Sequence, residues 1–449
     1  MRRVPTLILS CLLLGTPAAS AASKGEAAPS TAPARDSVTL DSLPDEDGVA
    51  ALLWERSTQF TQARIRVDEA QAELTRTQLL PNPELDLSWN TLPLGPTNPP
   101  GLDRLRDVPN YQAGVSQLVE LGKRGPRQRS ARAALSATAL DVQAELRELT
   151  YDFLQRVAAV ATAQVRLAEL EGLAADAARL TELERIRQQR GDTAGLDVDR
   201  AVLEEAQLQG QLAEEHSNLS EALLECSRAA GLACVPFSAR ELAASFLERR
   251  LSRTQAPNTE DLPQRPDLRA LQAQRQSSQE SLTLARRGWV PDPTFRVGYV
   301  HDRFVESGNQ LNSVFVGMSF PLPVFDHGQA SARLASAQAE AAERTRQQLT
   351  SQARRDVTAL IAQRDALEAR RAQVRQKNLP LASSLVGRLE AAVKAGGASL
   401  QDLIFARRTY GQLLLDAAQL DLNAYHLSVE LERASAAGPR APGELGSHF

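Results

Sequence analysis

Four short segments of the chain alternate apolar and polar residues, which is typical of strands with two different faces. In the first segment, Leu85, Leu87 and Trp89 are each separated by one polar residue. The same alternation predicts strands at about 84–90, 111–119, 294–301 and 312–320.

Long stretches after each pair of strands repeat apolar residues every three or four positions, as amphipathic helices do. They predict helical hairpins at about 127–230 and about 330–433, with a kink in the second at Pro380. A shorter helix is predicted at 45–80, and another begins near Pro266. The last helix has an unbroken seam of the kind found in coiled coils, formed by Leu403, Ala406, Tyr410, Leu413, Ala417, Leu420, Ala424, Leu427 and Leu431.

The two halves of the chain resemble each other. The segment RTQLLPNPELDLSWN returns as RRGWVPDPTFRVGYV, so that Pro81 corresponds to Pro291. Farther along, RGDTAGLDVDRA is echoed by AGGASLQDLIFA, so that Asp197 corresponds to Asp402. A nearly constant spacing between such matches indicates a duplicated unit.

The duplication and the turn signals divide the chain into six parts. The N-terminus reads as a secretory signal peptide, because two arginines precede a short apolar run and a small-residue cleavage site. The parts are the signal peptide at 1–21, a flexible leader at 22–44, a first repeat at 45–231, an irregular equatorial segment at 232–264, a second repeat at 265–433 and a disordered tail at 434–449.

Composition supports long helices and argues against a nucleic-acid role. Aromatic residues make up 4% of the chain, while Ala, Leu, Gln, Glu and Arg dominate. The formal net charge of −4 gives no basic surface for a nucleic acid.

Cys226 and Cys234 are the two cysteines outside the signal segment. In an exported protein they are candidates for a disulfide at a helix end, and the alternative is two small buried thiols. A metal site from this pair is not expected, because no histidine or third cysteine accompanies it.

The strands are close in length to the ~9–11 residues with which a tilted strand crosses a bilayer. Four strands are too few to close into a membrane barrel, and an open edge in lipid leaves backbone groups unpaired. Several chains would therefore have to share one barrel. The alternative is an ordinary two-faced sheet in a soluble protein.

These features together resemble the TolC-type outer-membrane efflux proteins, and especially their cation-efflux branch. The motifs that carry the resemblance are LLPNPELDLSW, VELGKRGPRQRSARAAL, WVPDPTFRVGY and FPLPVFDHGQASARLASAQAE. The resemblance covers about residues 50–433. It implies a mainly α fold with a transmembrane β part, in which two repeats per chain each combine a β-hairpin with long coiled-coil helices. It further implies a homotrimer with a twelve-stranded barrel and a helical periplasmic tunnel.

The resemblance also implies partners and a location. The channel would sit in the outer membrane of a Gram-negative bacterium, in contact with its lipid, with a large periplasmic part. It would dock onto a periplasmic adaptor and a proton-driven inner-membrane pump.

In the family, the turns of the helical hairpins form the periplasmic mouth, and acidic residues ring it. By residue match Asp402 holds the first acidic position, Phe405 replaces the second acid, and Asp197 matches a tip aspartate of the first repeat. Arg407 and Arg408 are candidates to pair with these acids. The remaining gate candidates are Asp199, Gly191, Gly195, Gly396 and Gly397. The alternative for Asp197 and Asp402 is that they only cap helices.

Aromatic residues flank the strands, as they do at the two surfaces of a membrane. The interface candidates are Trp89, Tyr111, Trp289, Tyr299, Phe320 and Phe325. Lys123, Arg124 and Arg127 follow a strand and are expected to meet lipid headgroups, unless they are only a solvated helix start.

No cofactor, metal site or catalytic motif is evident, and the chain is not expected to be an enzyme. The leading interpretation is a passive efflux conduit, with metal cations as the cargo favoured by the family resemblance. The alternatives are a drug-efflux or type I secretion channel of the same fold, and a periplasmic coiled-coil adaptor or scaffold.

Overall fold

The structure is a computed structural model of the 449-residue chain. It describes residues 37–90, 94–96, 100–103, 107, 110–191, 195–252, 259–302, 310–436 and 438–439. The predicted signal peptide and most of the predicted leader lie outside the described residues.

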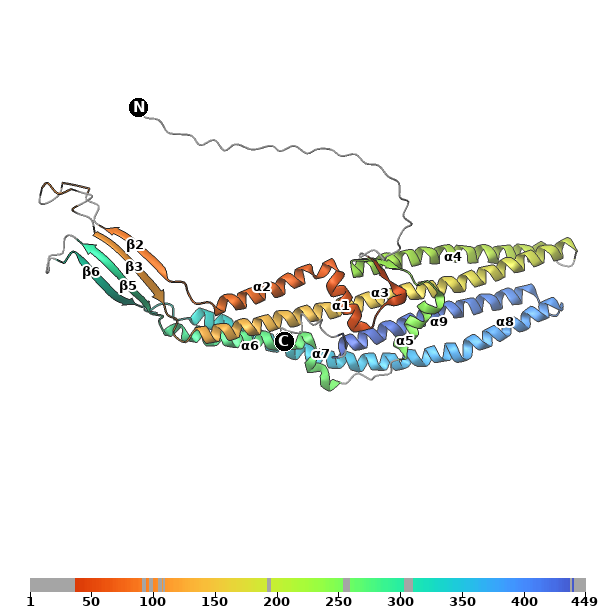
Figure 1. Ribbon diagram of the computed structural model, residues 1–449. Coiled ribbons are helices and arrows are strands. Elements are labelled where there is room, and N and C mark those ends of the chain that lie inside the picture. Colours follow the sequence, from red (N-terminus) through yellow and green to blue (C-terminus); the bar gives the residue numbers. More distant parts are fainter. Residues whose placement is uncertain are drawn as a thin grey trace, which may run out of the picture. The chain divides into compact units, whose positions relative to one another are not determined.

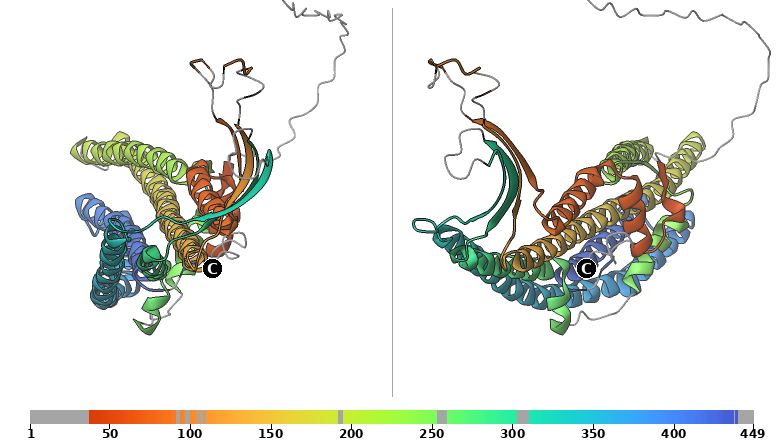
Figure 2. Two further views of the ribbon diagram at one scale, coloured as in Figure 1. Left: turned by 90° about the vertical axis from the view of Figure 1, so that its left-hand side faces the viewer. Right: turned by 60° about the vertical axis from the view of Figure 1, so that its left-hand side comes forward.

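The four predicted strands form one antiparallel sheet in the order β2-β3-β5-β6 (Figure 1). The strands are β2 (Glu84–Asn90), β3 (Asn110–Leu118), β5 (Thr294–Asp302) and β6 (Asn312–Ser319). Their bounds agree with the predicted ones to within one residue. The two hairpins join through β3 and β5, so the sheet combines strands from both predicted repeats. Figure 2 shows the four strands as one curved layer.

Long helices follow each hairpin, as predicted. After the first hairpin, α3 (Arg124–Gln189) packs against α4 (Gly195–Ala230). After the second hairpin, α7 (Gln329–Gln373) and α8 (Leu379–Lys394) precede α9 (Leu400–Ala434). Both α7 and α8 pack against α9, and α3 also contacts α9.

The expected kink near Pro380 takes the form of a π-helical turn, Val374–Asn378, between α7 and α8. Proline lacks the N–H that would continue the ordinary ladder, and a wider turn is one way to accommodate that loss. Asp421 on α9 receives hydrogen bonds from Arg371 and Arg375, and so attaches this turn to the neighbouring helix.

The prediction of one helix over 45–80 is wrong. The segment forms α1 (Glu46–Arg56) and α2 (Thr61–Gln78), separated by extended Ser57 and a short 3₁₀ turn. The break turns Trp54 and Phe60 toward each other, with ring centroids 5.6 Å apart, and both are buried. Burial of these two rings outweighs the local preference for a continuous helix.

Two further predictions need correction near the disulfide. The predicted leader contains β1 (Ser37–Thr39), which pairs in parallel with β4 (Ala233–Val235). The segment predicted to be irregular contains β4 and the helix α5 (Arg240–Leu251). Its apolar residues Ala243, Phe246 and Leu247 are buried in the main core, together with residues of α1, α3 and α9.

The prediction of a disordered tail after Ala434 is also wrong for its first residues. Ser435 is buried, and its carbonyl oxygen accepts a hydrogen bond of 2.7 Å from the Arg147 guanidinium. Arg147 also donates to the carbonyl of Arg433, so it satisfies carbonyl groups at the end of α9. The helix α6 (Pro266–Arg286) packs against both α3 and α7.

Candidate functional site at the ends of the long helices

The turns that join the long helices depend on glycine. Gly191 follows α3 with φ +80°, and Gly396 follows α8 with φ +74°. This left-handed region is accessible to glycine but strained for most other residues. Gly397 donates its N–H to the carbonyl of Ala392, 2.8 Å away, and Gly195 is the first residue of α4. Residues 192–194 lie outside the described residues.

Asp402 lies in the first turn of α9, where a carboxylate is stabilised by the helix dipole. It is not the cap. Ser399 is the cap: its hydroxyl accepts the N–H of Asp402 at 3.1 Å and donates to the Asp402 carboxylate at 2.6 Å. Asp402 remains exposed, as does Phe405 one turn later.

Asp197 occupies the matching place in the first turn of α4. Its carboxylate pairs with Arg200 of the same helix at 3.1 Å. Asp197 is half-buried, whereas Asp199 near this turn is exposed. Both hairpins therefore begin their second helix with acidic groups near the turn.

The predicted pairing of Arg407 and Arg408 with these aspartates is wrong. Arg407 forms an ion pair with Glu390 on α8 at 2.6 Å, and it donates to the backbone carbonyl of Asp176 on α3. The two arginines follow Asp402 by five and six positions, whereas side chains that meet along one helix are three or four positions apart.

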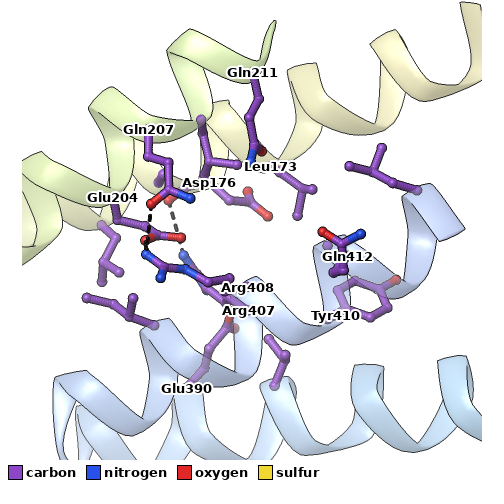
Figure 3. A pocket seen from close by; sticks show the side chains of 17 residues that line it. Leu173, Asp176, Glu204, Gln207, Gln211, Glu390, Arg407, Arg408, Tyr410 and Gln412 are labelled. Atoms are coloured by element: carbon purple, nitrogen blue, oxygen red, sulfur yellow. Dashed lines mark hydrogen bonds and ion pairs between the residues drawn. The ribbon is translucent and has the colours of Figure 1, made fainter. Parts of the chain in front are cut away.

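Arg408 connects α9 to α4. It forms an ion pair with Glu204 on α4 and donates to Gln207 of the same helix at 3.0 Å (Figure 3). The Glu204 carboxylate, which is almost fully buried, raises the pKa of Arg408 through their hydrogen bond. A buried carboxylate that loses its cation is costly, so this contact favours the observed arrangement of α4 and α9.

A small cavity of about 100 Å³ lies beside these ion pairs. Its wall combines the charged groups with apolar side chains from α3, α8 and α9, among them Leu173, Val386 and Ile404. A separate apolar cluster nearer the turns holds Leu180 of α3 against Leu400 and Leu403. The hairpin ends are thus held by apolar packing together with ion pairs between helices.

Glu204 and Glu390 were not among the predicted site residues. A signal for them existed, because Arg407 and Arg408 directly follow the buried seam residue Ala406. Charged residues beside a coiled-coil seam commonly pair with acids on neighbouring helices. The sequence does not show which helices are the neighbours.

The predicted interface aromatics lie at both ends of the sheet. Trp89 stacks on Tyr111 with ring centroids 5.7 Å apart, and the Tyr111 ring approaches His301. Tyr299 lies on the same strand as His301, and its hydroxyl hydrogen-bonds Asn312 at 2.5 Å. At the other end, the ring centroids of Trp289 and His327 are 4.5 Å apart. Phe320 and Phe325, also at this end, are exposed.

The basic residues after β3 have partners within the chain. Lys123 pairs with Asp292 at 2.8 Å, and Arg127 pairs with Glu120. Arg124 donates to the carbonyl of Gln78 at 2.6 Å. These three side chains therefore connect the segments that meet where strands pass into helices.

Cys226 and Cys234 form a disulfide. The bond attaches the end of α4 to β4, and thereby to the β1–β4 pair. Of the two sequence-based alternatives, the structure shows the bridge.

In the part of the chain that the structure describes, no helix combines the length and the apolar character needed to cross a membrane. Over the same residues, no group of three or more His, Cys, Asp or Glu side chains is arranged to hold a metal ion.

Comparison with known proteins gives a family match for part of the chain. Residues 260–437 match the model of a family described as "Outer membrane efflux protein". No curated protein matches the chain.

Solved structures show where this fold occurs. The outer-membrane channel OprN matches with a TM-score of 0.66 and 17% identity, over 89% of this chain and 91% of that chain. CusC, described in terms of folding and transmembrane channel formation, matches with a TM-score of 0.69 and 16% identity, over 87% and 91%. The Campylobacter jejuni CmeC outer membrane channel matches with a TM-score of 0.67 and 15% identity, over 89% and 87%. The chain thus has the mainly helical fold of outer-membrane channels.

Proposed function

We propose that this protein is a passive outer-membrane channel of a tripartite efflux system. The observation that carries the proposal is an apolar row on one face of the sheet, formed by Leu85, Val115, Val297 and Val316 in consecutive register. All four are exposed, Val316 to 81%. Such a face requires an apolar environment, and lipid provides one. The match of residues 260–437 and the shared fold support this function.

Three copies would complete the membrane part. β2 and β6 each pair on one side only in the described chain, and an unpaired edge in lipid costs several kcal/mol per backbone group. A trimer would place twelve strands in one closed sheet, and the long helices would continue the conduit into the periplasm. The interface aromatics, including Trp89 and Phe325, would lie at the levels of the lipid headgroups.

The helix ends would form the periplasmic mouth and meet the adaptor, with the inner-membrane pump behind it. Asp402 and Asp199 are exposed, and Asp197 is half-buried, near the turns that lead to this mouth. Three copies of each would make a mouth that attracts cations and repels anions. We therefore favour metal cations as the cargo over drugs or secreted proteins.

Conductance measurements test the channel function. The purified mature protein should form cation-selective pores in planar bilayers, visible as a reversal potential in a salt gradient. Asp402→Ala should reduce cation preference, because it removes negative charge from the mouth. A chain that remains monomeric and water-soluble without detergent would contradict the proposal.

A deletion strain tests the cargo. Increased sensitivity to metal salts, with unchanged sensitivity to drugs, would support cation efflux. The opposite pattern would leave the channel function in place and overturn the cargo.

A further inference from the structure

We propose that a groove where α2 passes into β2 binds a zwitterionic phospholipid of the phosphatidylethanolamine class. Its phosphate would lie on Arg76, its ammonium group on Glu73 and an acyl chain over Leu79 and Leu80. Figure 1 shows α2 leading into β2, so the groove lies where the helical part gives way to the sheet. The inference rests on the proposed channel function and goes beyond it by naming a lipid class and the residues that recognise it.

The groove is open and has a volume of about 380 Å³. Its lining includes the end of α2 and the extended residues that follow the helix, among them Leu79, Leu80 and Asn82. Leu79 and Leu80 are 63% and 65% exposed, and the chain enters β2 shortly after them, at Glu84. Exposed apolar side chains thus continue from the strand to the end of the helix, and a lipid acyl chain is an occupant of matching character.

A cation and a carboxylate line the same groove. The Nε and Nη2 atoms of Arg76 each donate a hydrogen bond of 2.8 Å to the carboxylate of Glu73. The two side chains are 78% and 50% exposed. The hydrogen bonds from Arg76 lower the pKa of Glu73, so this carboxylate stays ionised. The Nη1 group of Arg76 can donate to a phosphate, and the carboxylate oxygens keep lone pairs for an ammonium group.

The balance of charge favours a zwitterion over an anion. Arg127, the other cation of the groove, pairs with Glu120, so each arginine is already matched by a carboxylate of the same chain. A headgroup with a phosphate and no cation would bring its negative charge beside Glu73. A headgroup with both a phosphate and an ammonium group is complementary to both members of the Arg76–Glu73 pair.

The junction between α6 and β5 differs at the decisive position. In the correspondence between the two halves of the sequence, Arg286 takes the place of Arg76, but Thr283 stands where the first half has Glu73. The carboxylate that would receive an ammonium group is therefore missing there. We expect one headgroup site per chain, at the end of α2.

Competition between lipids tests the site. The full mature protein in detergent is mixed with equal amounts of phosphatidylethanolamine, phosphatidylcholine and phosphatidylglycerol that share the same acyl chains, and native mass spectrometry identifies the bound lipid. Phosphatidylethanolamine should be retained preferentially. Phosphatidylcholine has no N–H to donate and phosphatidylglycerol has no cation, so each should bind about tenfold more weakly.

Two substitutions separate the two charges. Glu73→Gln should remove the preference for phosphatidylethanolamine over phosphatidylglycerol, because the ammonium group loses its partner. Arg76→Gln should weaken the binding of all three lipids, because each of them carries a phosphate. The conductance of each variant, and its migration as a multimer on a native gel, confirm that it folds and assembles.

Arg179→Gln is the matched control. Arg179 pairs with Asp176 at the same spacing along a helix, and the two side chains are 76% and 48% exposed, almost as in the proposed site. The pair does not line the groove. The control should therefore keep the lipid preference of the parent, and a loss equal to that of Arg76→Gln would overturn the site.

The remaining outcomes separate the site from the function on which it rests. Equal retention of the three lipids by a conducting parent would overturn the site and leave the channel function in place. Displacement of the bound lipid by inorganic phosphate alone would overturn the zwitterionic headgroup. Dissociation of Arg76→Gln into monomers in lipid-free detergent would identify the groove as a contact between copies instead. A parent that neither conducts nor forms multimers would overturn the proposed function.

Discussion

Lys123 and Asp292 are 169 residues apart in the sequence, yet the Lys123 ammonium is 2.8 Å from a carboxylate oxygen of Asp292. The second oxygen of Asp292 accepts the backbone N–H of Leu121 at 2.9 Å. One carboxylate therefore holds the end of β3 against the start of β5, at the point where both strands pass into helices.

A double-mutant cycle should detect this contact. Both side chains are about 20% exposed (21% for Lys123 and 18% for Asp292), so solvent screening reduces the interaction. We expect a coupling free energy of about 1 kcal/mol between Lys123→Ala and Asp292→Ala. Asp292→Ala alone should cost more than Lys123→Ala alone, because it also leaves the Leu121 N–H unpaired. Denaturant unfolding in detergent provides the measurement, and additive effects would contradict the prediction.

Arg408→Ala should loosen the contact between the two hairpins and raise single-channel conductance. Glu204→Gln should act in the same direction, because it removes the charge while keeping the shape. Either change should also lower the free energy of unfolding, by about 1–3 kcal/mol. Arg200→Ala is the matched control: its partner Asp197 belongs to the same helix, so conductance should change less. Equal effects of all three changes would count against a specific role for Arg408.

Gly298→Ala should destabilise the sheet. An added Cβ would lie 2.5 Å from a ring carbon of Phe315 and 2.6 Å from the carbonyl oxygen of Ala113. Relieving such overlap typically costs about 1–3 kcal/mol. Gly317→Ala is the control, since its added Cβ meets no atom of the same chain within 4 Å. Thermal unfolding followed by circular dichroism should show a lower midpoint for the first variant only.

His426 should make stability fall at acidic pH. Burial lowers the pKa of His426, and its Nε2 atom is buried without a hydrogen-bond partner among the described residues. The unfolded chain, where the histidine pKa is about 6.5, then binds a proton more readily than the folded chain. The contribution of His426 is therefore complete above about pH 6.5 and is lost as the pH falls through its folded-state pKa.

The comparison of the parent with His426→Gln isolates that contribution. Burial raises the pKa of Asp141 and Glu148, so these acids act in the opposite direction at lower pH, equally in both proteins. Between pH 8 and 5.5 the parent should lose more stability than the variant. Parallel pH profiles would contradict the prediction.

Local patterns predicted the strands and the long helices well, because alternation and seam periodicity report directly on which face is buried. The break at Ser57 and the helix α5 could not be found in this way. Both depend on packing between distant segments, in which Trp54, Phe60 and Phe246 find their places in the core. The site shows the same division. The glycine turns and the place of Asp402 beside one of them could be predicted from the sequence. The pairing of Glu204 with Arg408 could not, because it requires that α4 and α9 be neighbours.

The π-helical turn at Val374–Asn378 determines the direction in which the side chains of the following helix, α8, point. Each residue of an α-helix advances the side-chain direction by about 100°, so a turn that contains one residue more rotates the next segment by about that angle. The apolar stripe of α8, with Leu389 and Val393, faces Leu403 only because of this offset. Replacing the π-helical turn by ordinary α-helix without deleting a residue would therefore turn that stripe away from its neighbour, even though no apolar residue had been removed.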